Sequence, residues 1–211
     1  MIKFCNVDIV RGNKSILENV SFTVSKGEKC VITGSSGCGK TSLLLAVMGF
    51  CSIPKGILKI NGTELTIQTL NIVRSQIAYI SQEPVLGSGN VLEAIMLPFG
   101  FKANKNIKPE ISKIKETLGK FGLSNDILNK RCVDVSGGEK QRIVIARAFL
   151  MNKSIFMADE VTTGLDTGNA SIVRDFLGLP DLTVLSVSHD PFWIEKQQSV
   201  YKIENGKLMR V

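Results

Sequence analysis

A glycine-rich octapeptide at positions 34–41, GSSGCGKT, constrains this chain most, because it fits the phosphate-binding pattern GxxxxGK[ST]. An apolar, strand-like run from Cys30 to Thr33 precedes it, and a helix-like run from Leu43 to Met48 follows. Glycines let successive backbone N–H groups turn toward one anion, and the next helix adds its positive dipole. The pattern predicts a nucleoside triphosphate site, and a simple Gly/Ser-rich turn is the weaker alternative.

The residues of this loop have distinct expected roles. Lys40 is expected to neutralise the β and γ phosphates, and the Thr41 hydroxyl to ligate Mg²⁺. Cys38 is expected to serve as a small residue that a thiol reagent could modify. The other phosphate contacts are expected from Gly34, Ser35, Ser36, Gly37, Cys38, Gly39 and Ser42.

A second glycine-containing motif, VSGGEKQR at positions 135–142, narrows the class of nucleotide-binding protein. The Ser136 hydroxyl and the amides of Gly137 and Gly138 stand at a predicted helix start, where they form another anion site. Glu139 in the first turn suits the helix dipole. A lone SGG is more often an ordinary helix cap, so its meaning depends on the motifs that come after it in the chain.

An acidic pair follows the next apolar strand. The run from Ile155 to Ala158 closes on Asp159 and Glu160. Ligands of open α/β sheets bind beyond the carboxyl ends of the strands, so Asp159 is placed to hold magnesium. Glu160 then lies beside the metal, where a carboxylate can deprotonate an attacking water.

In this order, the motifs resemble those of ATP-binding cassette (ABC) proteins over essentially the whole chain. VSGGEKQR resembles the family signature LSGGQ, with Val135 for Leu and Glu139 for Gln, and the acidic pair resembles the Walker B motif. Gln82 matches the glutamine that contacts magnesium and passes the nucleotide state to a membrane partner. Asp166 ends a D-loop-like TGLD, and His189, the single histidine, matches the switch histidine that senses the γ-phosphate.

The resemblance therefore implies three sets of site residues. The catalytic set is Lys40, Gln82, Glu160 and His189. The magnesium set is Thr41, Gln82 and Asp159. Further contacts with ATP are implied for Ser136, Gly137, Gly138 and Asp166.

One family feature is replaced in this sequence. ABC ATPases usually stack adenine on an aromatic ring upstream of the phosphate loop, and the alignment with the family places Arg11 there. A planar guanidinium can stack on a base. Alternatively, Arg11 is an exposed turn residue and Val10 or Val20 packs against adenine, so base selectivity is left open.

Hydrophobic periodicity indicates how the chain is organised. Ile2–Val10 and Ile16–Val24 alternate like strands and predict an N-terminal antiparallel β layer. Apolar residues recur at helical spacing in the middle of the chain, at Ile111, Ile114, Leu118 and Phe121. We expect one ABC ATPase domain over 1–211, of the α/β class: a P-loop NTPase core with a mainly parallel sheet at 1–82 and 142–211, and an inserted helical subdomain at 83–141.

Length and cysteine content limit the class further. A chain of 211 residues suits one domain, and its longest apolar stretch, Leu43 to Cys51, is far shorter than the ~20 residues that cross a bilayer. The N-terminus has no signal-peptide pattern, so we expect a cytoplasmic protein. Five cysteines without a CxxC pair, with a single histidine, argue against a disulfide framework and a zinc site.

The net charge of +7 is concentrated in one region. Residues 100–145 hold ten Lys/Arg against five Asp/Glu. No recognition-helix motif or interleaved aromatic residues accompany them, so nucleic-acid binding is not expected. Two interpretations stay open: a solvated helical face, or a surface directed toward acidic groups of a membrane subunit or anionic lipid headgroups.

The resemblance implies the ATP-hydrolysing subunit of an ABC transporter, peripheral on the cytoplasmic face of the membrane. Two copies, or one copy and a homologous subunit, would pair head to tail and power separate integral membrane permease subunits. Gln82-Glu83-Pro84 and the compact insertion favour the export-linked or lipoprotein- and metal-handling subclass. The alternatives are a soluble ABC-type ATPase not coupled to transport, and a P-loop small-molecule kinase.

Overall fold

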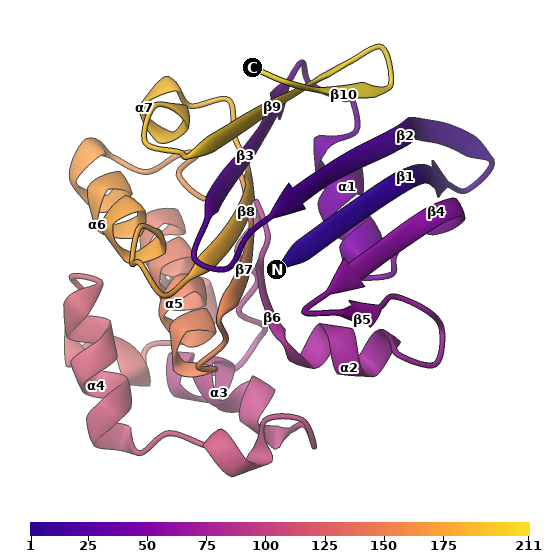
Figure 1. The fold of residues 1–211 in the computed structure, drawn as a ribbon. Helices are drawn as coiled ribbons and strands as arrows, with labels where there is room; N and C mark the ends of the chain where they lie inside the picture. Colours follow the sequence, from indigo (N-terminus) through magenta and orange to yellow (C-terminus); the bar gives the residue numbers. More distant parts are fainter.

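Two β-sheets of different kinds organise the chain in the computed structural model, which describes residues 1–211 (Figure 1). The strands are β1 (Ile2–Arg11), β2 (Lys14–Val24), β3 (Lys29–Gly34), β4 (Ser52–Ile60), β5 (Thr63–Glu64), β6 (Ile77–Ile80), β7 (Ile155–Asp159), β8 (Thr183–Val187), β9 (Ser199–Glu204) and β10 (Lys207–Arg210). The first sheet has the order β2-β1-β4-β5 and is antiparallel. The second has the order β10-β9-β3-β8-β7-β6, and all its pairs except β10 with β9 are parallel. The predicted α/β core with an antiparallel N-terminal layer is confirmed.

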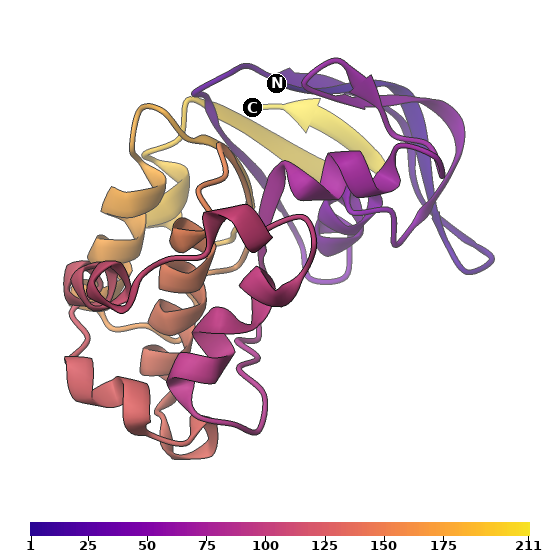
Figure 2. The ribbon, with the colours of Figure 1, turned by 90° about the horizontal axis from the view of Figure 1, so that it is seen from below.

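Helices cover both faces of the parallel sheet. They are α1 (Lys40–Val47), α2 (Leu70–Ser75), α3 (Val91–Met96), α4 (Ile111–Lys120), α5 (Gly137–Leu150), α6 (Thr167–Leu177) and α7 (Pro191–Ile194). Short 3₁₀ turns lie at Leu97–Gly100, Lys105–Ile107, Asn125–Asn129 and Cys132–Asp134. Figure 2 shows the antiparallel sheet with α1 on one side of the molecule and α3 to α6 on the other.

The parallel strands separate two hydrophobic cores. Along β7, Ile155 and Met157 face the core shared with α1 and the antiparallel sheet, whereas Phe156 and Ala158 face the core formed with the other helices. All five residues of β7 and of β8 are buried, because helices or strands pack on both faces of the sheet. The continuous apolar runs in the sequence follow from this two-sided burial.

The helical segment departs in detail from the sequence pattern. Ile114, Leu118 and Phe121 are buried as the stripe predicts, but Ile111, in the first turn of α4, is 46% exposed.

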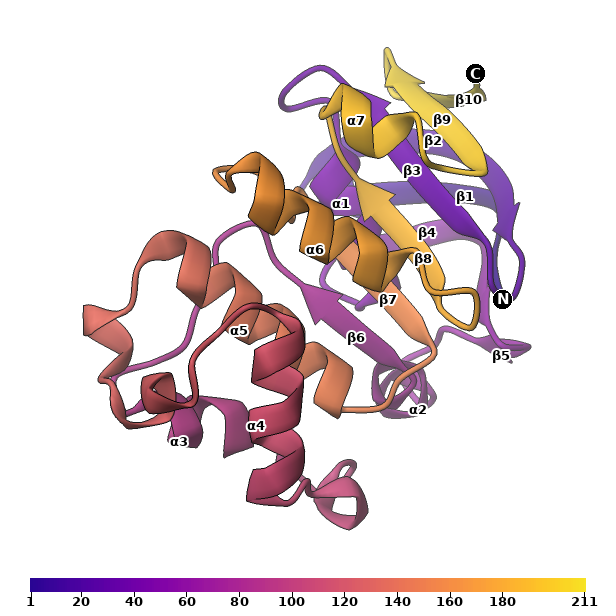
Figure 3. The ribbon, with the colours of Figure 1, turned by 90° about the vertical axis from the view of Figure 1, so that its left-hand side faces the viewer.

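Residues 81–136 project from the sheet, and α5 leads back to it (Figure 3). Because α5 runs unbroken through positions 141 and 142, the expected subdomain boundary falls inside a helix. No helix of the chain combines the length and apolar character that a membrane crossing requires.

A bulge between β1 and β4 depends on Gly56. The register of the two strands shifts between Cys5 and Asp8, and Gly56 adopts a φ of 86° opposite this shift. A Cβ at this position would overlap the carbonyl of Asn6 and lie 2.6 Å from the carbonyl oxygen of Cys5. Gly62 has a similar φ of 83°, but no atom lies within 4 Å of the Cβ that it lacks.

Alanine variants at Gly62 and Gly56 distinguish the cost of backbone strain from the cost of steric overlap. Gly62→Ala should lower the free energy of unfolding by about 1 kcal/mol, the cost of a left-handed conformation for alanine. Gly56→Ala should lower it by roughly 3 kcal/mol or more, because backbone atoms must also move. Chemical denaturation of both variants measures the difference, and equal losses would contradict the role given to the bulge.

Candidate functional site

Four loops meet where the parallel strands end. The phosphate loop follows β3, and Gln82, Glu160 and His189 follow β6, β7 and β8. Since the carboxyl ends of parallel strands lie at one edge of the sheet, segments far apart in sequence come together there. Together with the hairpin of β1 and β2 they form a cavity of about 650 Å³, lined by Arg11, Ile16, Gly34, Ser35, Ser36, Gly37, Gly39, Lys40, Thr41, Ser42, Gln82, Glu160 and His189.

The phosphate loop wraps around the ammonium group of Lys40. This side chain is 7% exposed, and its Nζ donates to the carbonyl oxygens of Gly34 and Ser35, at 2.9 Å each. Gly39 has a φ of 112° and is the N-cap of α1, so the positive end of the helix dipole points into the loop. The loop therefore combines a fixed cation and a helix N-terminus, as an anion site requires.

A buried carboxylate lies behind the phosphate loop. Asp159 is 2% exposed, and its Oδ1 accepts a hydrogen bond from the Thr41 hydroxyl at 3.2 Å. Burial, with the nearby charge of Glu160, raises the pKa of Asp159 above its ordinary value, although the hydroxyl donors act in the opposite direction. Asp159 does not line the cavity itself and reaches it through Thr41.

Tyr79 is a site residue that the sequence reasoning missed. Its hydroxyl donates to Oδ2 of Asp159 at 3.4 Å from the neighbouring strand β6. Burial, and then the charge of Asp159, raises the pKa of Tyr79 to about 12, so the phenol stays protonated and remains a donor. The signal available in the sequence was the hydroxyl of Tyr79, the only polar side-chain group in the apolar strand β6.

Glu160 presents its carboxylate where three other side chains meet. Its Oε2 lies 3.5 Å from Gln82 Nε2, 3.3 Å from His189 Nδ1 and 3.5 Å from the Thr163 hydroxyl. Its backbone N–H donates to the carbonyl of Val187 at 2.9 Å, and its φ of 48° is in the left-handed region. Such strained residues concentrate at functional sites, because the surrounding bonds must hold them in place.

The second glycine motif begins a helix, as predicted, but lies outside this cavity. Ser136 caps α5: its Oγ accepts from Glu139 N at 3.3 Å, and Oε2 of Glu139 accepts from Ser136 N at 2.9 Å. Asp166 caps α6 by accepting from Asn169 N at 2.9 Å. Ser136, Gly137, Gly138, Asp166 and Cys38 do not line the cavity, so their contacts with a nucleotide stay a prediction.

Two hydrogen bonds that the sequence did not reveal connect these loops. Gln141, buried in the second turn of α5, donates its amide to the carbonyl of Val161 at 3.2 Å. Thr162 donates its hydroxyl to Asp190 at 3.2 Å. The loop after Glu160 is therefore tied both to α5 and to the residue after His189.

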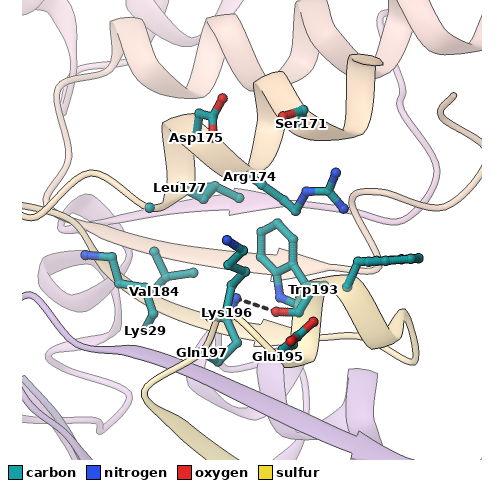
Figure 4. Close-up of a pocket in the computed structure, with 12 residues that line it drawn as sticks. Lys29, Ser171, Arg174, Asp175, Leu177, Val184, Trp193, Glu195, Lys196 and Gln197 are labelled. Carbon is teal, nitrogen blue, oxygen red and sulfur yellow. Dashed lines mark hydrogen bonds between the residues drawn. The ribbon is translucent and has the colours of Figure 1, made fainter. Parts of the chain in front are cut away.

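A second cavity, of about 580 Å³, lies between α6 and α7 (Figure 4). Lys29 borders it, but its Nζ already donates to three carbonyl oxygens, of Gly27, Leu179 and Leu182. The Trp193 ring beside it is buried and donates its N–H to Ser186 at 2.9 Å. The polar groups of Lys29 and Trp193 are therefore already paired within the chain.

The phosphate loop follows β3 and Glu160 follows β7, and β8 lies between these two strands. A phosphate loop opposite a glutamate at a strand end is the arrangement of P-loop nucleoside triphosphatases. A family model described as ABC transporter matches residues 17–163, and the chain belongs to this family. Its domain is accordingly an ABC-type ATPase, with the fold that the sequence predicted.

Similar proteins include both short and long chains. The probable iron export ATP-binding protein FetA of Escherichia coli (strain K12) is 31% identical over 208 residues, which are 97% of this chain and 91% of FetA. ABC transporter B family member 18 of Arabidopsis thaliana is 34% identical over 220 residues, and the match covers 99% of this chain. The chain spans only 18% of the length of that plant relative.

Two solved structures share the fold. The dimeric ATP-binding cassette MJ0796, in a post-hydrolysis state bound to ADP and Pi, has a TM-score of 0.85 and 25% identity, covering 100% of this chain and 97% of that one. A bacterial Atm1-family ABC exporter with ATP bound has a TM-score of 0.86 and 23% identity, covering 98% of this chain and 37% of the exporter.

Arg11 lies at the end of β1, is exposed, and lines the cavity together with Ile16. Neither Val10 nor Val20 lines it, and Val20 is buried in the core. This placement favours contact of the guanidinium with the base, but stacking itself stays a prediction.

Arg11→Ala should weaken ATP binding by about 1 kcal/mol, or roughly fivefold, because an exposed cation–π contact is lost, whereas Arg11→Tyr should preserve the affinity. Nucleotide titration measures both. Lys14→Ala is the matched control, since Lys14 pairs with Arg11 across the hairpin but does not line the cavity. Unchanged affinity of Arg11→Ala for ATP would mean that Arg11 is an exposed turn residue that does not contact the base.

Proposed function

We propose that this chain hydrolyses ATP to power transport through separate integral membrane subunits. The observation that carries the proposal is the carboxylate of Glu160, which faces the phosphate loop and is in contact with Gln82 and His189. Likeness to FetA over nearly the full length of both chains supports a subunit of the export-linked or metal-handling kind. A small-molecule kinase is no longer a competing assignment for a chain of this family.

The residues around Thr41 fit a magnesium ion. Hydroxyl, carboxylate and amide oxygens are the ligands that Mg²⁺ prefers, and Thr41, Asp159 and Gln82 supply them. The buried carboxylate of Asp159 has only hydroxyl donors as partners, so a cation would stabilise its ionised form. Bound Mg²⁺ would neutralise charge on the β and γ phosphates during transfer.

The protein groups would act by positioning and by stabilising charge. Lys40 would exchange its bonds with the loop carbonyls for bonds with phosphate oxygens. Glu160 would accept the proton of the attacking water, while Gln82 and Thr163 hold its carboxylate in place. His189 is 65% exposed at the cavity and would donate to the γ-phosphate.

A second chain would complete the site. The Ser136 hydroxyl and the N-terminus of α5 are absent from the cavity of their own chain, although they resemble an anion site. A head-to-tail dimer, of two copies or of one copy and a homologous subunit, would bring them to the partner's ATP. The dimeric form of MJ0796 with ADP and Pi supports this arrangement.

The position of the chain at the cytoplasmic face of a membrane is part of the same proposal. Gln82 lies in a loop that also exposes Val85 by 69%, an apolar side chain available to a membrane subunit. Co-purification with a multi-span membrane protein encoded by a neighbouring gene tests this part. A chain that hydrolyses ATP but binds no such protein would instead be a soluble ABC-type ATPase.

Glu160→Gln tests the general base directly. The variant should bind ATP normally but turn over roughly 100-fold more slowly, because an amide cannot accept the proton, and it should accumulate as an ATP-bound dimer. Steady-state hydrolysis and size-exclusion chromatography with ATP measure the two effects. Glu64→Gln, an exposed carboxylate on β5, is the control and should behave as wild type. A monomeric Glu160→Gln protein with near-normal turnover would rule the assignment out.

Mixing two inactive variants tests the shared site. If each site joins Lys40 of one chain to Ser136 of the other, a mixed dimer of Lys40→Ala and Ser136→Arg chains has one intact site and regains ATPase activity. A site within one chain allows no rescue, because each chain carries a defect. Hydrolysis against mixing ratio, with exchange of chains verified by labelling, distinguishes the two models. The converse mixture of double variant with wild type should lose activity in a shared-site dimer.

A further inference from the structure

The segment between α3 and α4 carries basic side chains that have no acidic partners. Lys102, Lys105 and Lys108 are all exposed, and residues 101–108, here called the 101–108 loop, contain no aspartate or glutamate. The salt bridges of the chain use other basic residues. Three uncompensated ammonium groups this close in sequence favour an anionic partner outside the chain.

Apolar side chains stand among these lysines. Phe101 is 62% exposed and Ile107 is 37% exposed, whereas Phe99, two residues earlier, is 3% exposed in the helical core. The ring of Phe99 is thus buried, and the ring of Phe101 is exposed to solvent. A basic stretch with displayed aromatic and aliphatic side chains is the pattern of surfaces that enter the headgroup region of a bilayer.

Hydrogen bonds centred on Asn104 maintain this display. Its Nδ2 donates to the carbonyl of Pro98 at 3.1 Å, and its Oδ1 accepts from Nζ of Lys153 at 2.9 Å. The backbone N–H groups of Asn104 and Ile107 donate to the carbonyls of Phe101 and Asn104, at 3.0 and 3.1 Å. These consecutive turns tie the loop to the helical segment, so the exposed side chains belong to an ordered structure.

The loop also lies at an accessible place. Figures 1 and 3 show it at the lower edge of the molecule, between α3 and the start of α4 and away from both sheets. None of its residues lines the nucleotide cavity. A surface here can meet a large partner without obstructing the phosphate loop.

We infer that the 101–108 loop is a contact surface for anionic lipid headgroups of a membrane. The ammonium groups of its three lysines pair with lipid phosphates, and Phe101 and Ile107 enter the boundary between headgroups and acyl chains. Lysine ammonium groups pair with phosphates as point charges, and single apolar side chains between them can enter the interfacial region of a bilayer. This contact goes beyond the proposed function and does not require ATP hydrolysis.

Vesicle co-sedimentation of the full chain tests the inference. Wild type should partition onto vesicles of phosphatidylcholine mixed with phosphatidylglycerol, and not onto phosphatidylcholine alone. Replacing Lys102, Lys105 and Lys108 by Gln should lower the partition coefficient by roughly 100-fold, at about fivefold per lysine. A control with the same change of charge replaces Lys14, Lys55 and Lys207, exposed lysines of β2, β4 and β10, and should lower it by far less.

Variants that remove an exposed aromatic ring distinguish insertion of Phe101 into the bilayer from electrostatic attraction alone. Phe101→Ser should weaken binding to the anionic vesicles at high salt, where attraction between charges is screened, and Phe192→Ser, which removes a 70% exposed ring on α7, should not. ATPase activity should be unchanged in every variant, which keeps this test independent of the proposed function. Failure of wild type to bind anionic vesicles, equal losses in the two lysine triples, or binding of the loop only to an acidic membrane protein would overturn the inference.

Discussion

The burial of β7 and β8 on both faces is the constraint on which the other features depend. Each of these strands is enclosed between two cores, so the chain places its charged residues only where the strands end. Parallel pairing then puts all of these ends at the same edge. Asp159, Glu160 and His189 are neighbours for this reason, although thirty positions separate the first from the last.

Much of this arrangement was predictable from sequence. The loop at 34–41, the acidic pair after an apolar strand and the capped SGG helix each require a particular local structure, and each occurs as expected. Local chemistry determines such elements, because backbone freedom, strand pattern and cap hydrogen bonds involve residues close in the chain. The antiparallel N-terminal layer followed from the strand-like residue pattern of β1 and β2, which register shifts interrupt.

The features that escaped prediction all depend on contacts between distant segments. The hydrogen bond from Tyr79 to Asp159 requires β6 and β7 to be adjacent, and no local pattern specifies that pairing. The exposure of Ile111 reflects which turn of α4 reaches the core, since the helical stripe extends one turn beyond the contact.

The unbroken helix α5 has a mechanical consequence. It has 14 residues and is about 21 Å long, with Ser136 as its N-cap and Gln141 in its second turn, where the Gln141 amide donates to the loop that follows Glu160. A change in the conformation of this loop and a change in the direction of α5 are therefore linked through the amide of Gln141.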